Sequence, residues 1–187
     1  YASLAASSTK DRAGDATDLL RLAERELLDR ERRSTERRIR AAHFPVLKSM
    51  DTFDFKAQTS LNEALLRELL AGDYIARREN VLLVGNAGTG KTHLAIAPAM
   101  SACAQGRHVR FSSVTQLVTV LLEKREARSL EKFHLQLERY HLLVLDELGY
   151  VPFSKAGAEL LFDVVSRAYE RTSLIVTTNL PFAEWVE

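Results

Sequence analysis

Residues 85–92 constrain the fold of this chain more strongly than any other segment. Their sequence, GNAGTGKT, fits the pattern G-x-x-x-x-G-K-[ST] and follows a short apolar run at 81–84 that is typical of a buried strand. A stretch with helical character, 91–105, comes directly after it and ends before Gly106. A strand, a glycine-rich turn and a helix N-terminus in this order predict a loop whose backbone N–H groups point at phosphate oxygens.

The loop carries two side chains with specific chemistry. We expect Lys91 to reach the β- and γ-phosphates of a nucleotide, and the hydroxyl of Thr92 to bind Mg²⁺. The alternative, a glycine-rich turn that binds nothing, is disfavoured because the complete motif has the correct element on each side. The predicted nucleotide-binding residues are Gly85, Asn86, Ala87, Gly88, Thr89, Gly90, Lys91, Thr92 and His93.

Two acidic residues follow a second apolar run. Residues 142–145 read LLVL and predict a buried strand, and Asp146 and Glu147 come directly after it. We expect Asp146 to hold Mg²⁺ through water, and Glu147 to polarise the water that attacks the γ-phosphate. Apolar runs followed by acids are common, so this segment is informative only together with the glycine-rich loop. A strand at 108–111 separates the two motifs, and with the adjacent Glu147 it sets the chain apart from kinase-like and small GTPase-like proteins.

An amide side chain ends the next predicted strand, 174–178. Asn179 could contact the γ-phosphate and orient the attacking water, which makes it the third predicted catalytic residue beside Glu147 and Lys91. The alternative is that Asn179 is only a strand-ending turn residue, a position in which asparagine is frequent.

The order of the predicted elements indicates the fold class. Short apolar strands alternate with helices between residues 81 and 178, which predicts an α/β fold with a parallel sheet covered by helices on both faces. A helix at 61–70, capped by Gly72, precedes this alternating region.

We expect two domains. The first, 1–45, is an arginine-rich helical extension in which a flexible lead-in, 1–17, precedes a helix at 18–43. The second, 46–187, is the α/β core.

Composition excludes several classes of protein. The 187 residues suffice for one α/β domain with an extension, and 26 Lys and Arg residues against 25 Asp and Glu leave almost no net charge. Cys103 is the only cysteine, which excludes an intrachain disulfide and suits a reducing cytosol. No apolar run approaches the roughly 20 residues that span a bilayer, and the histidines lack the spacing of metal ligands. We therefore expect a cytoplasmic protein with no membrane partner.

Three segments together resemble one family. They are the glycine-rich loop with HLA at 93–95, the segment LDELGY at 145–150, and the segment TTNLPF at 177–182. In this combination the chain is similar to the IstB-like transposition helper ATPases, relatives of the DnaC helicase loader and the DnaA initiator among the AAA+ P-loop NTPases. The resemblance runs from about the arginine-rich helix to Trp185, and the second and third segments favour IstB-like proteins over DnaC.

This resemblance implies a bacterial ATPase encoded by a mobile element, with ATP and Mg²⁺ as cofactors. Such a protein would form homo-oligomers through ATP-bridged interfaces on duplex DNA, recruit a partner transposase and disassemble upon slow hydrolysis. Two alternatives stay open, a DnaC-like helicase loader and an ATP-gated assembly platform with little turnover. A small-molecule kinase would need a lid and an acceptor site, for which the sequence offers no candidate.

Two features concern the surroundings of the nucleotide. By analogy with the family, segment 51–55 would lie near the adenine, although its aromatic residues Phe53 and Phe55 could equally belong to the core. Pro98 departs from the family pattern because it lies within the helix after the loop, where it removes a backbone hydrogen bond and costs about 3 kcal/mol in a regular helix. We expect a kink there that could loosen sheet packing without affecting the phosphate contacts.

The chain begins at Tyr1 rather than at a methionine, and it stops at Glu187, shortly after the last predicted strand. We expect both ends to be cut, and the C-terminal part of the AAA+ module, with its arginine finger and sensor arginine, to be missing. Arg167 and Arg171 could substitute for these arginines, but Asp163, four residues before Arg167, favours an ordinary surface pair.

Two groups of basic residues are candidates for contacts with DNA phosphates. One follows the helix that begins at Ser113, in a position that faces the central channel in related initiators, and the other belongs to the arginine-rich helix. Each has a plainer alternative, a helix end favoured by the dipole or a solvated face with i,i+4 ion pairs. Without a base-reading module, binding would be independent of sequence and sensitive to salt. The candidates are Lys124, Arg125, Arg128, Lys132, Arg37 and Arg38.

Overall fold

The computed structural model describes residues 2–50, 53, 61–150 and 153–180. The chain divides into two compact units, Tyr1–Arg37 and Arg38–Glu187. This division falls after Arg37, before the boundary predicted at residue 45. The last turn of the arginine-rich helix therefore belongs to the second unit. Within the part of the chain that the structure describes, none of the helices combines the length and the apolar character that crossing a membrane requires.

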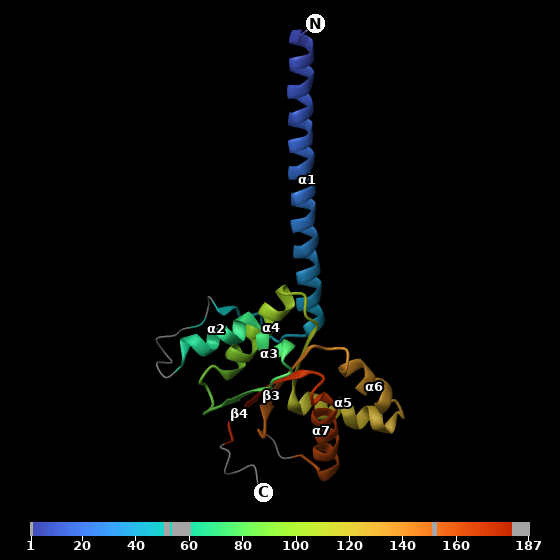
Figure 1. Ribbon diagram of the computed structural model, residues 1–187. Coiled ribbons are helices and arrows are strands. Elements are labelled where there is room, and N and C mark those ends of the chain that lie inside the picture. The colour runs from blue at the N-terminus through green and yellow to red at the C-terminus, as the bar shows by residue number, and fades with distance from the viewer. Residues whose placement is uncertain (1, 51–52, 54–60, 151–152, 181–187) are drawn as a thin grey trace. The chain divides into compact units, whose positions relative to one another are not determined.

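The first unit consists of most of one helix, α1 (Ala2–Ala42), which Figure 1 draws without interruption. The prediction of a flexible lead-in at 1–17 is wrong, because the helix already begins at Ala2. Alanine has the highest helix propensity of all residues, and this segment contains it repeatedly. Further along, exposed ion pairs such as Arg32 with Glu36, 3.1 Å apart, connect successive turns of α1.

Among its described residues, the second unit contains a four-stranded parallel sheet with the strand order β1-β4-β3-β2. The predicted parallel sheet is therefore confirmed. The strand that separates the two motifs in the sequence, β2, lies at one edge of the described sheet, whereas β4 lies between β1 and β3. The end of β4 is thus placed between the glycine-rich loop and the two acids. The strands are β1 (Val81–Val84), β2 (Val109–Ser113), β3 (Leu142–Leu148) and β4 (Ser173–Thr178).

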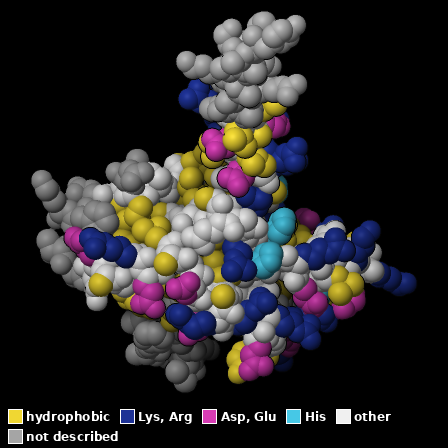
Figure 2. All heavy atoms as spheres, turned by 45° about the horizontal axis from the view of Figure 1, so that its top comes forward, with side chains coloured by type: hydrophobic (Ala, Val, Ile, Leu, Met, Phe, Trp, Pro, Cys, Tyr) yellow, Lys and Arg dark blue, Asp and Glu magenta, His cyan; other side chains and the backbone are white. Residues whose placement is uncertain are grey.

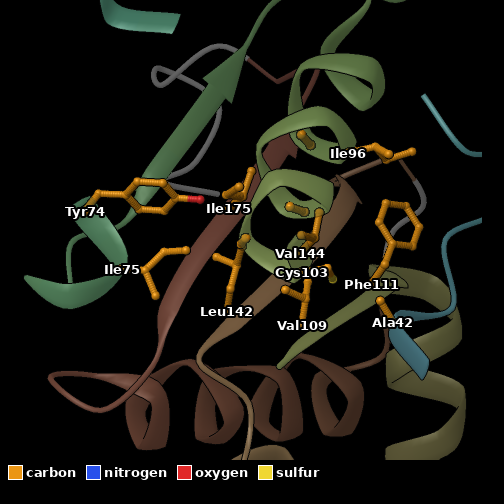
Figure 3. Close-up of a cluster of buried hydrophobic side chains, with 13 residues drawn as sticks. Ala42, Tyr74, Ile75, Ile96, Cys103, Val109, Phe111, Leu142, Val144 and Ile175 are labelled. Atoms are coloured by element: carbon orange, nitrogen blue, oxygen red, sulfur yellow. The ribbon is translucent and has the colours of Figure 1, made fainter. Parts of the chain in front are cut away.

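Helices cover both faces of the sheet, as predicted (Figure 1). Successive side chains of a strand point to opposite faces, and β3 shows this directly. Val144 belongs to a cluster that packs against α4 (Figure 3), whereas Leu143 and Leu145 belong to a second cluster with α5 and α7. The helices of this unit besides the end of α1 are α2 (Glu63–Ala71), α3 (Asp73–Ala76), α4 (Lys91–Ala104), α5 (Val114–Glu126), α6 (Leu130–Leu137) and α7 (Lys155–Ala168).

Helix α4 contains Pro98, the residue at which a kink is predicted. The helix continues on both sides of this residue, and Pro98 is buried together with its neighbours Ala97 and Ala99. Proline lacks the N–H that would donate to the carbonyl of Leu94, so α4 loses one backbone hydrogen bond without ending. The first turn of α4, which carries the functional residues, precedes this position.

Candidate functional site

The glycine-rich loop, the end of β3 and the end of β4 surround a pocket of about 370 Å³. In a parallel α/β sheet, the carboxyl ends of the strands are the usual position of a binding site. The pocket brings together predicted residues that lie far apart in the sequence: Ala87, Gly88, Gly90, Lys91, Thr92, His93, Glu147 and Asn179. A larger cavity, of about 570 Å³, lies beside β2 and α5 and contains none of the predicted site residues.

The loop takes its shape from residues with positive φ. Gly88 and Gly90 have φ angles of 79° and 85°, in the left-handed region that favours glycine. Two further hydrogen bonds hold the loop: Thr89 Oγ1 donates to the carbonyl of Asn86 at 2.8 Å, and the N–H of Gly85 donates to the carbonyl of Thr178 at 3.2 Å. The beginning of the loop is therefore attached to the end of β4.

Lys91 is the first residue of α4, and its side chain bends back over the loop. Its ammonium group donates to the carbonyl oxygens of Gly85 and Asn86, each at 2.7 Å. Because an ammonium group has three N–H donors, one remains for a further acceptor in the pocket. This arrangement holds a positive charge directly beside the helix N-terminus, where an anion is favoured.

The carboxylate of Asp146 is nearly buried, at 5% exposure, and lies against two hydroxyl groups. Thr92 Oγ1 is 3.1 and 3.0 Å from its two oxygens, and Thr177 Oγ1 donates to Oδ1 at 2.5 Å. Oxygen donors of this kind suit Mg²⁺, which binds through one or two carboxylates and keeps waters and phosphates as its other ligands. The residues present therefore fit the predicted ion, and Thr92 and Asp146 are the pair that would hold it.

Glu147 adopts an unusual backbone conformation, with φ at 64° in the left-handed region. The register explains why: Leu145 pairs with Val176 and Leu148 with Thr178, so the two residues between them on β3 face only Thr177 on β4. This is a β-bulge, which turns a side chain away from its regular direction. The exposed side chain of Glu147 lines the pocket instead of continuing the alternation of β3.

Asn179 follows β4 directly, is exposed and lines the same pocket as Glu147. The preceding residue fixes the end of the strand, since Thr178 Oγ1 donates to the carbonyl of Leu148 at 2.8 Å and accepts from the N–H of Leu180 at 3.0 Å. Four further residues line the pocket that were not among the predicted site residues: Lys48, Tyr150, Thr177 and Thr178. Lys48 belongs to none of the three segments that carry the resemblance, so only the folded structure places it there.

His93 lines the pocket, and its ring contacts Ser49 and Phe53. Its Nε2 lies 2.8 Å from the carbonyl oxygen of Ser49, and its ring meets the ring of Phe53 edge-on, with centroids 5.1 Å apart. Phe53 also lies close to Gly90, where an added Cβ would be 3.3 Å from its ring. Phe53 thus lies beside the glycine-rich loop, and the other residues of segment 51–55 lie outside the described residues.

The predicted DNA-contacting residues fall in different places. Lys and Arg side chains gather on the right of the molecule in Figure 2, where Figure 1 shows α5 and α6. Arg125 lies in the last turn of α5, Arg128 in the connection, with φ at 51°, and Lys132 in the first turn of α6, and all three are exposed. The half-buried Lys124 precedes Arg125.

The two arginines of α1 differ from each other. Arg37 is exposed and belongs to the first unit. Arg38 is half-buried in the second unit, and its Nε donates to the carbonyl oxygen of Cys103 at 2.7 Å. This carbonyl is near the C-terminal end of α4, where a cation is favoured, so Arg38 has a structural partner.

Arg167 connects α6 with α7. Its guanidinium donates to both carboxylate oxygens of Glu131, at 3.1 and 3.0 Å, and to Asp163 at 3.3 Å. The expected pair with Asp163 is therefore confirmed, and Arg171 lies 3.6 Å from Glu138. The guanidinium group of Arg167 is therefore bound by carboxylates of its own chain.

The same interface buries His134, which is 1% exposed with Nε2 3.2 Å from a carboxylate oxygen of Asp163. Burial, followed by the positive charge of Arg167, lowers the pKa of His134 below its ordinary value. The folded state therefore binds this proton less readily than the unfolded state does. Its contribution to stability is complete above about pH 6.5 and is lost as the pH falls below that value.

We expect the free energy of unfolding to decrease between pH 7.5 and pH 5.5, with His134 contributing at most about 1.4 kcal/mol. Urea unfolding of the wild type and of His134→Gln at both values measures this contribution. The variant should lose less stability than the wild type over the interval. An unchanged pH dependence in the variant would mean that other groups, such as His141, whose pKa burial also lowers, account for the whole effect.

Comparison with known sequences identifies relatives along most of the chain. The family model described as "IstB-like ATP binding protein" matches residues 1–187. The ATP-binding protein of insertion sequence IS5376 from Geobacillus stearothermophilus is 40% identical over 169 residues, which cover 90% of this chain and 67% of the relative. That of insertion sequence IS21 from Pseudomonas aeruginosa is 38% identical over 158 residues, 84% of this chain and 60% of the relative. The chain thus spans about two thirds or less of the length of these relatives.

Solved structures share the fold of most of this chain. A crystal structure of the DnaC helicase loader has a TM-score of 0.61 and 26% identity, and the match covers 72% of this chain and 77% of that one. AMPPCP-bound DnaA from Aquifex aeolicus has a TM-score of 0.63 and 20% identity, over 73% of this chain and 43% of that one. The fold is therefore that of the AAA+ P-loop domains.

Proposed function

This chain belongs to the family of IstB-like ATP-binding proteins, and on that premise we propose that it hydrolyses ATP, assembles on duplex DNA and recruits a partner transposase. One observation carries the proposal. Lys91, Thr92, Glu147 and Asn179, which three separate segments contribute, line a single pocket at the carboxyl ends of the strands. A site that only bound a phosphate would need the loop, but it would not need the acid and the amide opposite it.

Each residue of the pocket has a distinct role in this proposal. The backbone N–H groups of the loop and the ammonium of Lys91 bind the β- and γ-phosphates. Thr92 and Asp146 would hold Mg²⁺, which would supply positive charge beside the phosphate oxygens. Glu147 accepts the proton of the attacking water, and Asn179 orients that water through its amide.

Assembly and DNA binding rest on different features. Exposed Arg125, Arg128 and Lys132 offer positive charge for a phosphate backbone at the α5–α6 connection. The names of the relatives connect them to insertion sequences, which supports a transposase as the partner. ATP acts as the switch, because subunits that bury the nucleotide between them respond to its γ-phosphate. We place this activity in the bacterial cytoplasm, where the DNA is found.

A helicase loader is the second candidate, and the similarity to the DnaC structure favours it. A loader would bind single strands and a helicase, whereas a transposition helper would bind duplex DNA and a transposase. The choice of DNA therefore separates the two proposals.

Fluorescence anisotropy with labelled duplex and single-stranded DNA, in the presence of an ATP analogue, ADP or no nucleotide, tests the function. We expect salt-sensitive binding to duplex that requires the ATP analogue. In Arg125→Gln with Lys132→Gln, duplex affinity should fall about tenfold or more, and the salt dependence should lose a slope of about 2 because two phosphate contacts are removed.

The matched control is Arg67→Gln with Arg77→Gln, which removes two charges from the α2–α3 region in the same unit. It should leave duplex binding unchanged. A preference for single strands would favour the helicase loader, and the absence of DNA binding in every nucleotide state would contradict the DNA part of the proposal.

A further inference from the structure

Among the described hydrogen bonds, Thr177 is the one residue of β4 whose side chain contacts both Asp146 and Glu147. Its hydroxyl donates to Asp146 Oδ1 at 2.5 Å and accepts from the backbone N–H of Glu147 at 2.9 Å. Thr177 is 1% exposed, so no bulk water replaces either contact. A hydroxyl has a single proton to donate, and here that proton goes to the carboxylate that would hold Mg²⁺.

The bulge of β3 explains why this hydroxyl reaches both residues. Asp146 and Glu147 together face Thr177, because the regular pairing stops at Leu145 and resumes at Leu148. In a regular strand, the N–H of one residue would donate to a backbone carbonyl of the neighbouring strand. At the bulge, the N–H of Glu147 donates to the Thr177 hydroxyl instead. The unusual conformation of Glu147, with φ at 64°, is thus held by a side chain rather than by the strand ladder.

We propose that Thr177 is a positioning residue that sets the orientation of the Asp146 carboxylate and the backbone of Glu147 at the same time. This inference rests on the proposed function, which gives Asp146 the metal and Glu147 the attacking water. Because one hydroxyl serves both acids, its loss affects metal binding and turnover together. Binding of the nucleotide without metal depends on the loop and Lys91, and stays unchanged because neither described hydrogen bond of the Thr177 hydroxyl involves them.

The alternative is that Thr177 only fills space between β4 and α4. Thr177→Val separates the two possibilities, because valine has nearly the same shape and β-branching but cannot donate or accept a hydrogen bond. Thr177→Ser keeps the hydroxyl and loses a methyl group, which is the opposite change. A residue that acts through packing would tolerate valine better than serine, and one that acts through its hydroxyl would tolerate serine better.

The matched control is Thr172→Val. Thr172 is also buried, at 3% exposure, and precedes the opposite end of the same strand, where its hydroxyl donates to the carbonyl oxygen of Tyr140 at 3.1 Å. The substitution therefore removes one buried hydroxyl from the same region of the fold without approaching the pocket.

Three measurements on the whole chain test the proposal. Fluorescent ADP in EDTA reports nucleotide binding without metal, Mn²⁺ titration of the ADP complex by electron paramagnetic resonance reports the metal site, and phosphate release reports kcat. For Thr177→Val we expect Mn²⁺ affinity and kcat each to fall about tenfold or more, since a buried hydrogen bond to a charged group is lost, while metal-free ADP affinity stays within about twofold. Thr177→Ser should recover both to within about threefold, and Thr172→Val should match the wild type.

Retained Mn²⁺ affinity in Thr177→Val would overturn the proposal, as would a parallel loss of metal-free ADP binding or the absence of recovery in Thr177→Ser. The failure of the proposed function has a different signature. A wild-type chain that binds Mn²⁺ with ADP but releases no phosphate would contradict ATP hydrolysis, while the Mn²⁺ measurement would still decide the role of Thr177.

Discussion

Glu147→Gln should bind ATP as the wild type does and hydrolyse it about 10²- to 10⁴-fold more slowly, the range that a positioned general base contributes. The reason is that glutamine keeps the size of the side chain but cannot accept the proton of the attacking water at neutral pH. The contacts that bind the phosphates come from the loop and Lys91, and the substitution leaves them in place. Phosphate release and equilibrium binding of a fluorescent ATP analogue measure the two properties separately.

The backbone of Glu147 requires a control of its own, because a residue with φ at 64° is sensitive to substitution. Glu170 is the matched position: it is an exposed glutamate with φ at 56°, outside the pocket. Glu170→Gln should hydrolyse ATP at the wild-type rate and have nearly wild-type stability. If both variants lost activity alike, the conformation rather than the carboxylate would be responsible.

The same substitution tests the switch. If hydrolysis releases the assembly from DNA, Glu147→Gln should remain on duplex DNA with ATP long after the wild type has dissociated. Anisotropy after a chase with unlabelled DNA measures this lifetime. Dissociation of the variant as fast as the wild type would contradict the switch, even if its turnover were lost.

The fold was predictable because its signals are local. Each strand is a short apolar run, and the loop at 85–92 has a sequence that few other structures require. The main error was the flexible lead-in predicted at 1–17. Alanine and serine occur in both helices and loops, and here they belong to α1. Helix α6 was not predicted, because eight residues are too few for a clear helical pattern.

The site was predictable only where a residue belongs to a motif. The order of the strands could not be predicted, since no local pattern places β4 between β1 and β3. No role was predicted for Thr177 itself, which the sequence shows only as part of the segment that leads to Asn179. Its two contacts depend on a register shift in another strand. The left-handed conformation of Glu147 has the same origin, and a glutamate carries no sequence signal for positive φ. Geometry that arises between strands requires the folded structure.

Lys91→Ala should lower ATP affinity about 10- to 100-fold, because it removes a charged donor from the phosphates in a partly buried site. Nucleotide-dependent assembly should then be absent at ATP concentrations that saturate the wild type. The substitution also removes hydrogen bonds to the carbonyls of Gly85 and Asn86, each 2.7 Å long. Binding of a fluorescent ATP analogue and sedimentation with and without ATP measure the two effects.

Lys155→Ala is the matched control, since Lys155 is also the first residue of a 14-residue helix but is exposed and outside the pocket. A lysine at this position opposes the helix dipole, so alanine should not destabilise either helix. Lys155→Ala should therefore bind ATP and assemble as the wild type does. Assembly that survives Lys91→Ala would contradict the proposed site. Intact ATP binding with lost hydrolysis would instead mean that Lys91 acts on the transition state, where charge on the γ-phosphate develops, rather than on the bound nucleotide.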